Sequence, residues 1–207
     1  MIIETLVLGP FMANCYIVGS DRTKDAMVID ACADAQKVID TAKKQDLSIN
    51  TLITTHNHVD HIGAISEIRD ITGGQFVSHG AWRDPGLTER FARIMGPQFR
   101  MPPDPDRVVE DGDIIEVGDL KFKVIHTPGH SPDGISIYGH GVVFSGDTLF
   151  NLGIGRSDFT DSVHEDLMAS LTEKLMTLPD ETIVLSGHGP QTTIGYERKY
   201  NPFLRAY

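Results

Sequence analysis

The chain has 207 residues and carries 29 acidic against 18 basic side chains, which gives a formal net charge of -11. This length suits one domain with a sizeable core, so we expect residues 1–207 to form a single domain. The negative charge would repel a phosphate backbone, which argues against nucleic acid as a partner. The first ten residues have no basic segment and no long apolar run, so we expect a cytoplasmic protein with neither a secretory signal nor membrane contact.

Short apolar runs separated by turn residues open the chain. The runs at residues 2–8, 14–18 and 26–29 predict an antiparallel meander. The only two cysteines, Cys15 and Cys32, belong to no C-x-x-C pair. We expect them to be buried thiols, with a disulfide as the alternative.

A helix is predicted after the meander. Apolar side chains recur at helical spacing over residues 35–42, and Asp34 precedes them as a candidate N-cap. Lys43 and Lys44 suit the negative end of the helix dipole. Asp30, which ends the third strand run, could be a metal ligand, a helix cap or a solvated carboxylate.

The densest group of chemically active side chains lies between a predicted strand at residues 49–53 and a predicted helix at residues 64–69. Three histidines and one aspartate share six consecutive positions there: His56, His58, Asp60 and His61. In extended backbone, residues two apart point to the same side. The first two histidines can therefore converge on one metal ion, while the aspartate and the third histidine point toward a second. The alternative is a polar loop with surface histidines.

Gly73 and Gly74 end that helix before a predicted strand at residues 75–78. His79 follows this strand, and we expect a structural or solvent-exposed side chain because no partner motif accompanies it. Residues 80–107 then break the periodicity with five prolines and carry aromatic and arginine side chains. We interpret this segment either as a lid or substrate wall or as a plain surface loop.

The second half repeats the plan of strands with helices outside. Strands are predicted at residues 113–117, 121–125, 134–138, 141–144 and 183–185, with an amphipathic helix at residues 162–178. The two halves together predict an α/β fold, an αβ/βα sandwich. Three more ligand-type residues end predicted strands beside turn residues: His130, Asp147 and His188. We expect these strand ends, together with the histidine segment at residues 56–61, to lie along one edge of the sandwich.

These motifs resemble those of the metallo-β-lactamase fold hydrolases, and within them the glyoxalase II-like branch of hydroxyacylglutathione hydrolases and single-domain relatives. The signature T-H-x-H-x-D-H-x-G stands at residues 55–63, and His130, Asp147 and His188 follow in family order. The resemblance implies a four-layer fold with two central mixed sheets and helices outside. It also implies that Asp30 lies beside the metal site.

Two divalent transition-metal ions per chain are implied by the same resemblance. It assigns the seven ligand positions as follows: His56, His58 and His130 to the first ion, Asp60, His61 and His188 to the second, and Asp147 as the bridge. Imidazole nitrogen and carboxylate oxygen without thiolate suit zinc first, with iron or manganese as alternatives.

The implied activity is hydrolysis of S-lactoylglutathione, or of a related small acyl thioester, by attack of a metal-bound hydroxide. Asp60 and Asp147 are the implied catalytic residues, and Asp60 could serve as an acid in a mononuclear variant. Because a thiolate departs without a protonated acid, a thioester fits better than an amide. Arg156 occupies a place where the family keeps a basic residue near the substrate carboxylate, with a plain surface arginine as the alternative.

Other functions compete with this one. Residues 153–159 are similar to a stretch of the persulfide dioxygenases, mononuclear iron oxidoreductases on the same fold. A hydrolase of another small ester, a β-lactamase and a non-enzymatic metal-binding protein are further alternatives. The two-domain glyoxalase II enzymes bind glutathione with a C-terminal helical domain for which we find no room after residue 203, so we expect a weak KM for S-lactoylglutathione and tolerance of other thiol carriers. The oligomeric state is left open.

Overall fold

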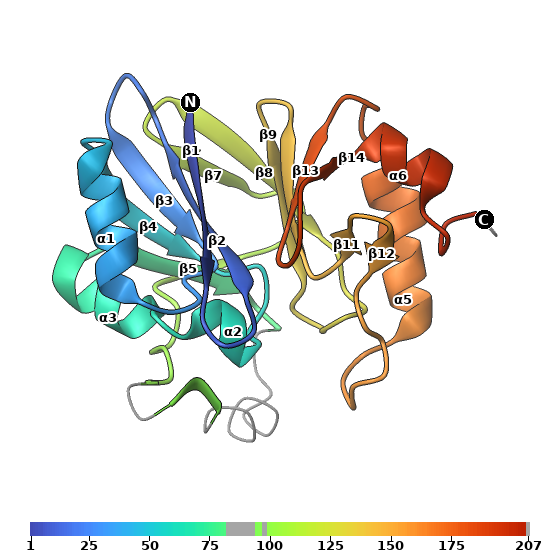
Figure 1. Cartoon of the computed structure of the whole chain (residues 1–207), viewed down its shortest axis with the longest axis horizontal. Helices are drawn as coiled ribbons and strands as arrows, with labels where there is room; N and C mark the ends of the chain where they lie inside the picture. The colour runs from blue at the N-terminus through green and yellow to red at the C-terminus, as the bar shows by residue number, and fades with distance from the viewer. Residues whose placement is uncertain (82–93, 97–98, 206–207) are drawn as a thin grey trace.

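Two mixed six-stranded sheets form the centre of the molecule in the computed structural model, which describes residues 1–81, 94–96 and 99–205. The sheets pack face to face, and helices cover the outer face of each (Figure 1). This arrangement is the predicted αβ/βα sandwich of four layers.

The first sheet has the strand order β1-β2-β3-β4-β5-β6. Its strands are β1 (Ile2–Leu8), β2 (Ala13–Gly19), β3 (Asp25–Ile29), β4 (Ser48–Ile53), β5 (Gln75–His79) and β6 (Arg107–Val109). β1, β2 and β3 pair antiparallel, which confirms the predicted meander, while β3 to β6 pair parallel. β2 is buried along its whole length because apolar layers lie on both of its faces.

The second sheet has the strand order β14-β13-β10-β9-β8-β7. Its strands are β7 (Ile114–Val117), β8 (Leu120–His126), β9 (Ile135–Gly139), β10 (Val142–Gly146), β13 (Ile183–Ser186) and β14 (Thr192–Thr193). β10 and β13 are parallel and the other neighbours are antiparallel. A separate hairpin, β11 (Leu149–Phe150) and β12 (Gly153–Ile154), follows β10. The sequence predicted neither this hairpin nor the short edge strands β6 and β14.

Helices α1 (Ala35–Lys44) and α3 (Ile65–Thr72) cover the first sheet, and α5 (His164–Ala169) and α6 (Ile194–Tyr200) cover the second (Figure 1). Asp34 caps α1 as predicted, because its carboxylate accepts a hydrogen bond from the Lys37 amide at 3.2 Å. Gly73 ends α3 in the left-handed conformation that glycine adopts without strain.

Three apolar clusters fill the spaces between the layers. Val38 and Ile68 lie in the cluster beneath α1 and α3, and Phe122 and Phe144 in the cluster between the sheets. The third cluster contains Leu171 and lies beneath the helices of the second sheet. Both cysteines are buried and free, so the prediction of thiols is confirmed and the disulfide alternative is wrong.

The prediction of one regular helix over residues 162–178 is only partly correct. α5 ends at Ala169, and a π-helical turn at Ser170–Lys174 and a 3-10 turn at Leu175–Thr177 continue it. The Ser170 hydroxyl donates to the Pro128 carbonyl at 2.8 Å, and the Thr172 hydroxyl donates back to the Met168 carbonyl at 2.8 Å. Such side-chain bonds compete with the helical pattern, and here one of them ties the helix to the loop before His130.

Much of the segment at residues 80–107 lies outside the described residues, including 82–93 and 97–98. Its role as a lid, substrate wall or surface loop therefore remains a prediction. Within the described ranges, no helix is long and apolar enough to cross a membrane.

Candidate metal centre

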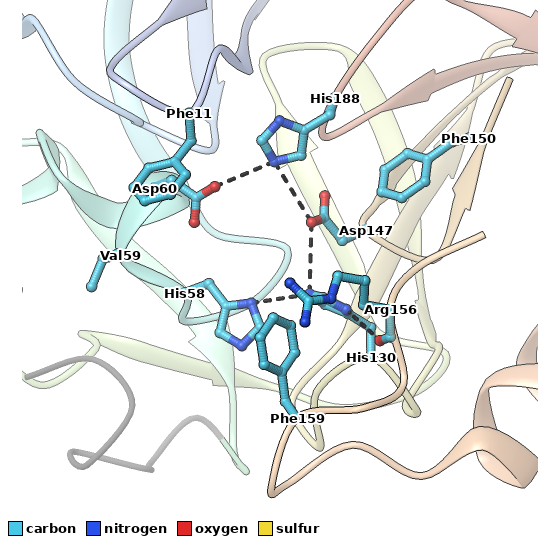
Figure 2. Close-up of a pocket in the computed structure, with 10 residues that line it drawn as sticks. All are labelled: Phe11, His58, Val59, Asp60, His130, Asp147, Phe150, Arg156, Phe159 and His188. Atoms are coloured by element: carbon cyan, nitrogen blue, oxygen red, sulfur yellow. Dashed lines mark hydrogen bonds and ion pairs between the residues drawn. The ribbon is translucent and has the colours of Figure 1, made fainter. Parts of the chain in front are cut away.

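The seven predicted ligands come together at one edge of the sandwich. His56 and His58 follow β4, and His130 follows β8. Asp147 follows β10, and His188 follows β13. Asp60 and His61 lie on the short helix α2 (Val59–Ile62), so the expectation of extended backbone holds for the first two histidines only. Figure 2 shows five of these side chains pointing toward one another around a pocket.

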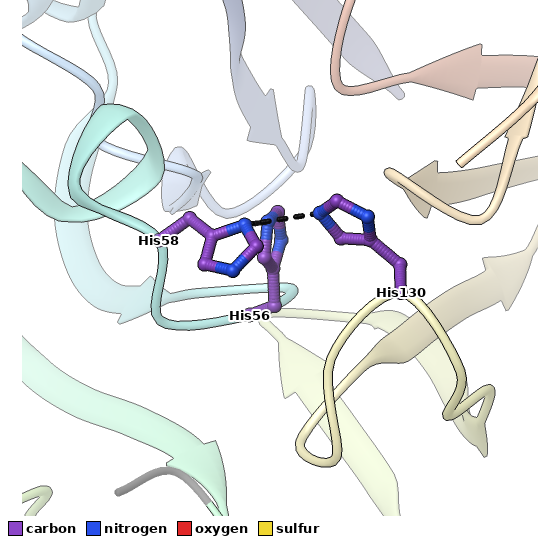
Figure 3. A group of neighbouring side chains, drawn as sticks. All are labelled: His56, His58 and His130. Carbon is purple, nitrogen blue, oxygen red and sulfur yellow. Dashed lines mark hydrogen bonds between the residues drawn. The ribbon is translucent and has the colours of Figure 1, made fainter. Parts of the chain in front are cut away.

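The first group consists of His56, His58 and His130. Nδ1 of His58 lies 3.0 Å from Nε2 of His56 and 3.0 Å from Nε2 of His130. The three rings face a common point (Figure 3). Nitrogen lone pairs this close repel one another unless a proton or a metal ion lies between them, and three convergent imidazoles are a common metal-binding arrangement.

The second group consists of Asp60, His61 and His188. Nε2 of His188 lies 3.3 Å from Oδ2 of Asp60, and Nε2 of His61 lies 3.9 Å from the same oxygen. The ligand-type atoms of each of these two groups lie within 4.8 Å of one another. The structure therefore brings together the residues that the resemblance assigned to each ion.

Asp147 lies between the two groups. Its Oδ2 is 3.6 Å from Nε2 of His130 and 3.6 Å from Nε2 of His188. Its Oδ1 is 3.5 Å from Nε2 of His61. A carboxylate in this position can contact cations on both sides.

The loop that carries His188 is fixed by β2 of the opposite sheet. The Asn14 amide N–H donates to the Gly187 carbonyl at 2.7 Å, and the Asn14 side chain donates to the Ser186 carbonyl at 2.9 Å. Gly187 has no space for a side chain, because a Cβ would lie 2.2 Å from Oδ1 of Asp147. The two sheets thus hold the second group jointly.

The outer nitrogens of the rings are held by hydrogen bonds that set their tautomers. Nδ1 of His61 donates to Oδ2 of Asp30 at 2.9 Å, and Nδ1 of His130 donates to the Arg156 carbonyl at 2.8 Å. Both rings therefore turn Nε2 toward the centre, which is the nitrogen that can bind a metal ion once it has lost its proton. Asp30 is 1% exposed and lies beside the site, so the solvated and helix-cap interpretations of this residue are wrong.

The two groups differ electrostatically. Burial lowers the pKa of His58 to about 3, and the nearby imidazoles of His130 and His61 act in the same direction. Burial also opposes a charge on His61, but the carboxylates of Asp147, Asp30 and Asp60 outweigh it and raise its pKa to about 10. Burial likewise lowers the pKa of His56. The carboxylates around His61, by contrast, attract a positive charge that a metal ion can supply in place of a proton.

Two orphaned atoms show that the residues fit a metal ion. Nε2 of His61 and Oδ1 of Asp147 are buried and have no hydrogen-bond partner in the described part of the chain. Buried polar atoms are nearly always paired, and both of these are of a type that ligates divalent metals.

A model of the metallo-beta-lactamase superfamily matches residues 8–188. The chain belongs to this superfamily. Its donor cluster of histidine and aspartate stands where the superfamily signature predicted it.

Similar proteins include a hydroxyacylglutathione hydrolase, GloC, from Haemophilus influenzae, which is 35% identical over 100% of this chain and 99% of its own length. Among solved structures, the BLEG-1 B3 metallo-beta-lactamase is 38% identical, with a TM-score of 0.91 over 99% of this chain and 100% of its own. ETHE1 from Myxococcus xanthus is 31% identical, with a TM-score of 0.85 over 100% of this chain and 85% of its own. TTHA1623 in a di-iron-bound form is 34% identical, with a TM-score of 0.86 over 97% of this chain and 100% of its own.

The candidate metal centre opens onto a pocket of about 340 Å³. Arg156 lines it, but its guanidinium donates two hydrogen bonds of 2.9 Å to Asp158. The sequence reasoning missed three aromatic lining residues: Phe11, Phe150 and Phe159. Phe11 follows Gly9-Pro10 in a turn between strands, and an exposed aromatic residue in such a turn is the one signal that could have identified it.

His79 is not part of the metal centre. Its ring stacks on His126 with 4.1 Å between centroids, and its Nδ1 accepts a hydrogen bond from the Ala81 amide at 3.3 Å. This contact joins the end of β5 to the end of β8 and favours the structural one of the two roles expected for His79.

Proposed function

We propose that the protein is a metal-dependent thioesterase that hydrolyses hydroxyacyl-glutathione thioesters or related small acyl thioesters. The observation that carries the proposal is the convergence of His56, His58 and His130 beside a second His/Asp group, with members of both groups lining one pocket. The full-length similarity to a hydroxyacylglutathione hydrolase supports the choice of a thioester.

Two divalent ions fit the two groups. The residues that would hold the first ion are His56, His58 and His130, those that would hold the second are Asp60, His61 and His188, and Asp147 would contribute a ligand to both. When bound, such a pair supplies a water of lowered pKa and polarises the carbonyl of the substrate. Zinc is our first choice, and the di-iron form of TTHA1623 supports iron as the alternative.

The chain's own residues then position the reactants. Asp147, between the two groups, and Asp60, 3.3 Å from His188, are the two carboxylates that line the pocket, and either could accept a proton from the attacking water. Water adds to the acyl carbon and the C–S bond breaks, which yields a carboxylic acid and a thiol. Because a thiolate is a good leaving group near neutral pH, a separate acid is unnecessary.

The proposal is tested by loading the purified protein with zinc, and separately with iron, and measuring metal content together with hydrolysis of S-lactoylglutathione. We expect two ions per chain and release of free thiol. The competing function, an iron-dependent persulfide oxygenase, predicts one ion and oxygen consumption with glutathione persulfide. Oxygen consumption without thiol release would replace the thioesterase proposal by this alternative.

A further inference from the structure

The pocket at the metal centre has a lining of two kinds. Among its described lining residues, each polar one belongs to the proposed ligand set except Arg156. The rest are apolar: Phe11, Val59, Phe150 and Phe159. The lining that remains after metal binding therefore presents mainly aromatic surface to a substrate.

The three phenylalanine rings come from separate segments and surround the centre (Figure 2). The Phe159 ring lies edge-on to His58 and His130, with centroid distances of 5.3 and 5.6 Å. The Phe150 ring lies 6.3 Å from the ring of His188. Phe11 reaches the same pocket from the turn between β1 and β2, and 39% of it is exposed. A carbonyl placed at the metal centre thus has aromatic rings on several sides.

Arg156 stands at the rim of this pocket. Its side chain is 66% exposed, and its guanidinium lies over the Phe159 ring at 4.4 Å while bound to Asp158. A pocket of about 340 Å³ cannot enclose both a tripeptide thiol carrier and a bulky acyl group, so we place the polar carrier toward the exposed Arg156 at the rim. The enclosed part is then left for the acyl group.

We propose, on the basis of the thioesterase function above, that the preferred substrates carry a bulky apolar acyl group, aromatic or branched, in place of the methyl group of a lactoyl thioester. Burial of apolar surface against Phe11, Phe150 and Phe159 stabilises the bound substrate roughly in proportion to the area removed from water. A small acyl group leaves this surface largely uncovered.

The test compares S-lactoylglutathione with S-mandeloylglutathione, which differ only by a methyl or a phenyl group on the carbon next to the carbonyl. With the metal-loaded enzyme, we expect kcat/KM for the mandeloyl thioester to exceed that for the lactoyl thioester by about tenfold or more. Equal values, or a preference for lactoyl, would overturn the inference while leaving the thioesterase function intact.

Substitutions locate the source of the preference. Phe11→Ala and Phe150→Ala should each reduce the ratio of the kcat/KM for the mandeloyl thioester to that for the lactoyl thioester about threefold or more. Phe203→Ala is the matched control, because Phe203 is 51% exposed and does not line the pocket. A ratio that changes equally in all three variants would contradict the assignment to this pocket.

A binding measurement separates the inference from the proposed function. Analogues with a methylene group between sulfur and carbonyl cannot be hydrolysed, and calorimetry gives their affinities directly. If neither thioester is hydrolysed but the phenyl analogue still binds tenfold more tightly than the methyl analogue, the thioesterase proposal fails and the apolar site stands. Equal affinities for the two analogues would overturn the apolar site itself.

Discussion

Asp30 accepts a hydrogen bond from Nδ1 of His61 at 2.9 Å, although 31 residues separate them in the chain. The same carboxylate accepts hydrogen bonds from the amide and hydroxyl of Thr55, at 2.7 and 2.8 Å. Asp30 therefore holds both the orientation of His61 and the first residue of the superfamily signature. Carboxylates in this position raise the basicity of the imidazole that they contact.

The first prediction concerns this contact. Asp30→Asn keeps the shape of the side chain but removes the charge that stabilises His61 as a metal ligand. We expect affinity for one of the two ions to fall about 10- to 100-fold, with the other ion retained. Competition with a chelator measures both affinities, and Asp34→Asn, at the cap of α1, serves as a control that should leave them unchanged. An unchanged affinity in Asp30→Asn would show that the contact plays no part in metal binding.

The second prediction concerns Asp147, which lies within 3.6 Å of ring nitrogens from both groups. Asp147→Ala should be the most damaging single substitution at the centre, because it removes a contact from both ions. We expect metal content to fall from two ions to one or none and thioester hydrolysis to fall at least about 100-fold. Elemental analysis and steady-state kinetics check this, with the exposed Asp40→Ala as control. Full metal content and activity would disprove the bridging role.

The third prediction concerns the pH dependence of stability. Asp133 is 2% exposed, and both of its carboxylate oxygens are buried. Burial raises its pKa to about 7, and the Asp161 carboxylate adds to the shift. The hydrogen bonds from the Ser131 side chain and from the backbone of Asp133 and Asn57 act in the opposite direction but are smaller. Between about pH 4 and pH 7 the folded state therefore keeps this proton and the unfolded state loses it, so the contribution of Asp133 to stability falls as pH rises through this window.

Asp133→Asn should remove this loss of folding stability at higher pH. We expect the free energy of unfolding of the metal-free variant to exceed that of the parent by up to about 4 kcal/mol at pH 8 and to differ little at pH 4. Urea denaturation at both pH values measures the difference, and other titrating groups cancel in the comparison. A variant that is less stable than the parent at pH 8 would contradict the prediction.

The fourth prediction concerns Gly129, which precedes His130. Its φ is +131°, and a Cβ there would lie 2.1 Å from the Leu167 amide nitrogen. Gly129→Ala should destabilise the fold by about 3 kcal/mol or more and weaken metal binding, because the His130 loop must move. Gly141→Ala is the matched control, since its φ of +79° is also unfavourable for alanine but a Cβ would meet nothing within 4 Å. We expect it to lose only about 1–2 kcal/mol. Similar thermal shifts in the two variants would show that the contact with Leu167 is unimportant.

Regular elements were predictable from the sequence where a local pattern decides them. The alternation of the meander, the cap at Asp34 and the glycine at position 73 each depend on neighbouring residues, and the structure confirms them. The helix at residues 162–178 was less predictable, because a bond from Ser170 to a distant carbonyl competes with the helical pattern.

The sequence by itself determined the ligand types and their order along the chain, because imidazoles and carboxylates at strand ends form a local signature that needs no tertiary contact to be read. The resemblance already grouped them around two ions with Asp147 as the bridge. Only the tertiary structure decided the distances between these side chains and which nitrogen each ring turns inward. It alone showed that Asp30 contacts Nδ1 of His61, and it alone placed Phe11 beside the rings of Phe150 and Phe159. These relationships join residues that are far apart in the chain, so they depend on the packing of two sheets against each other and leave no periodic trace in the sequence.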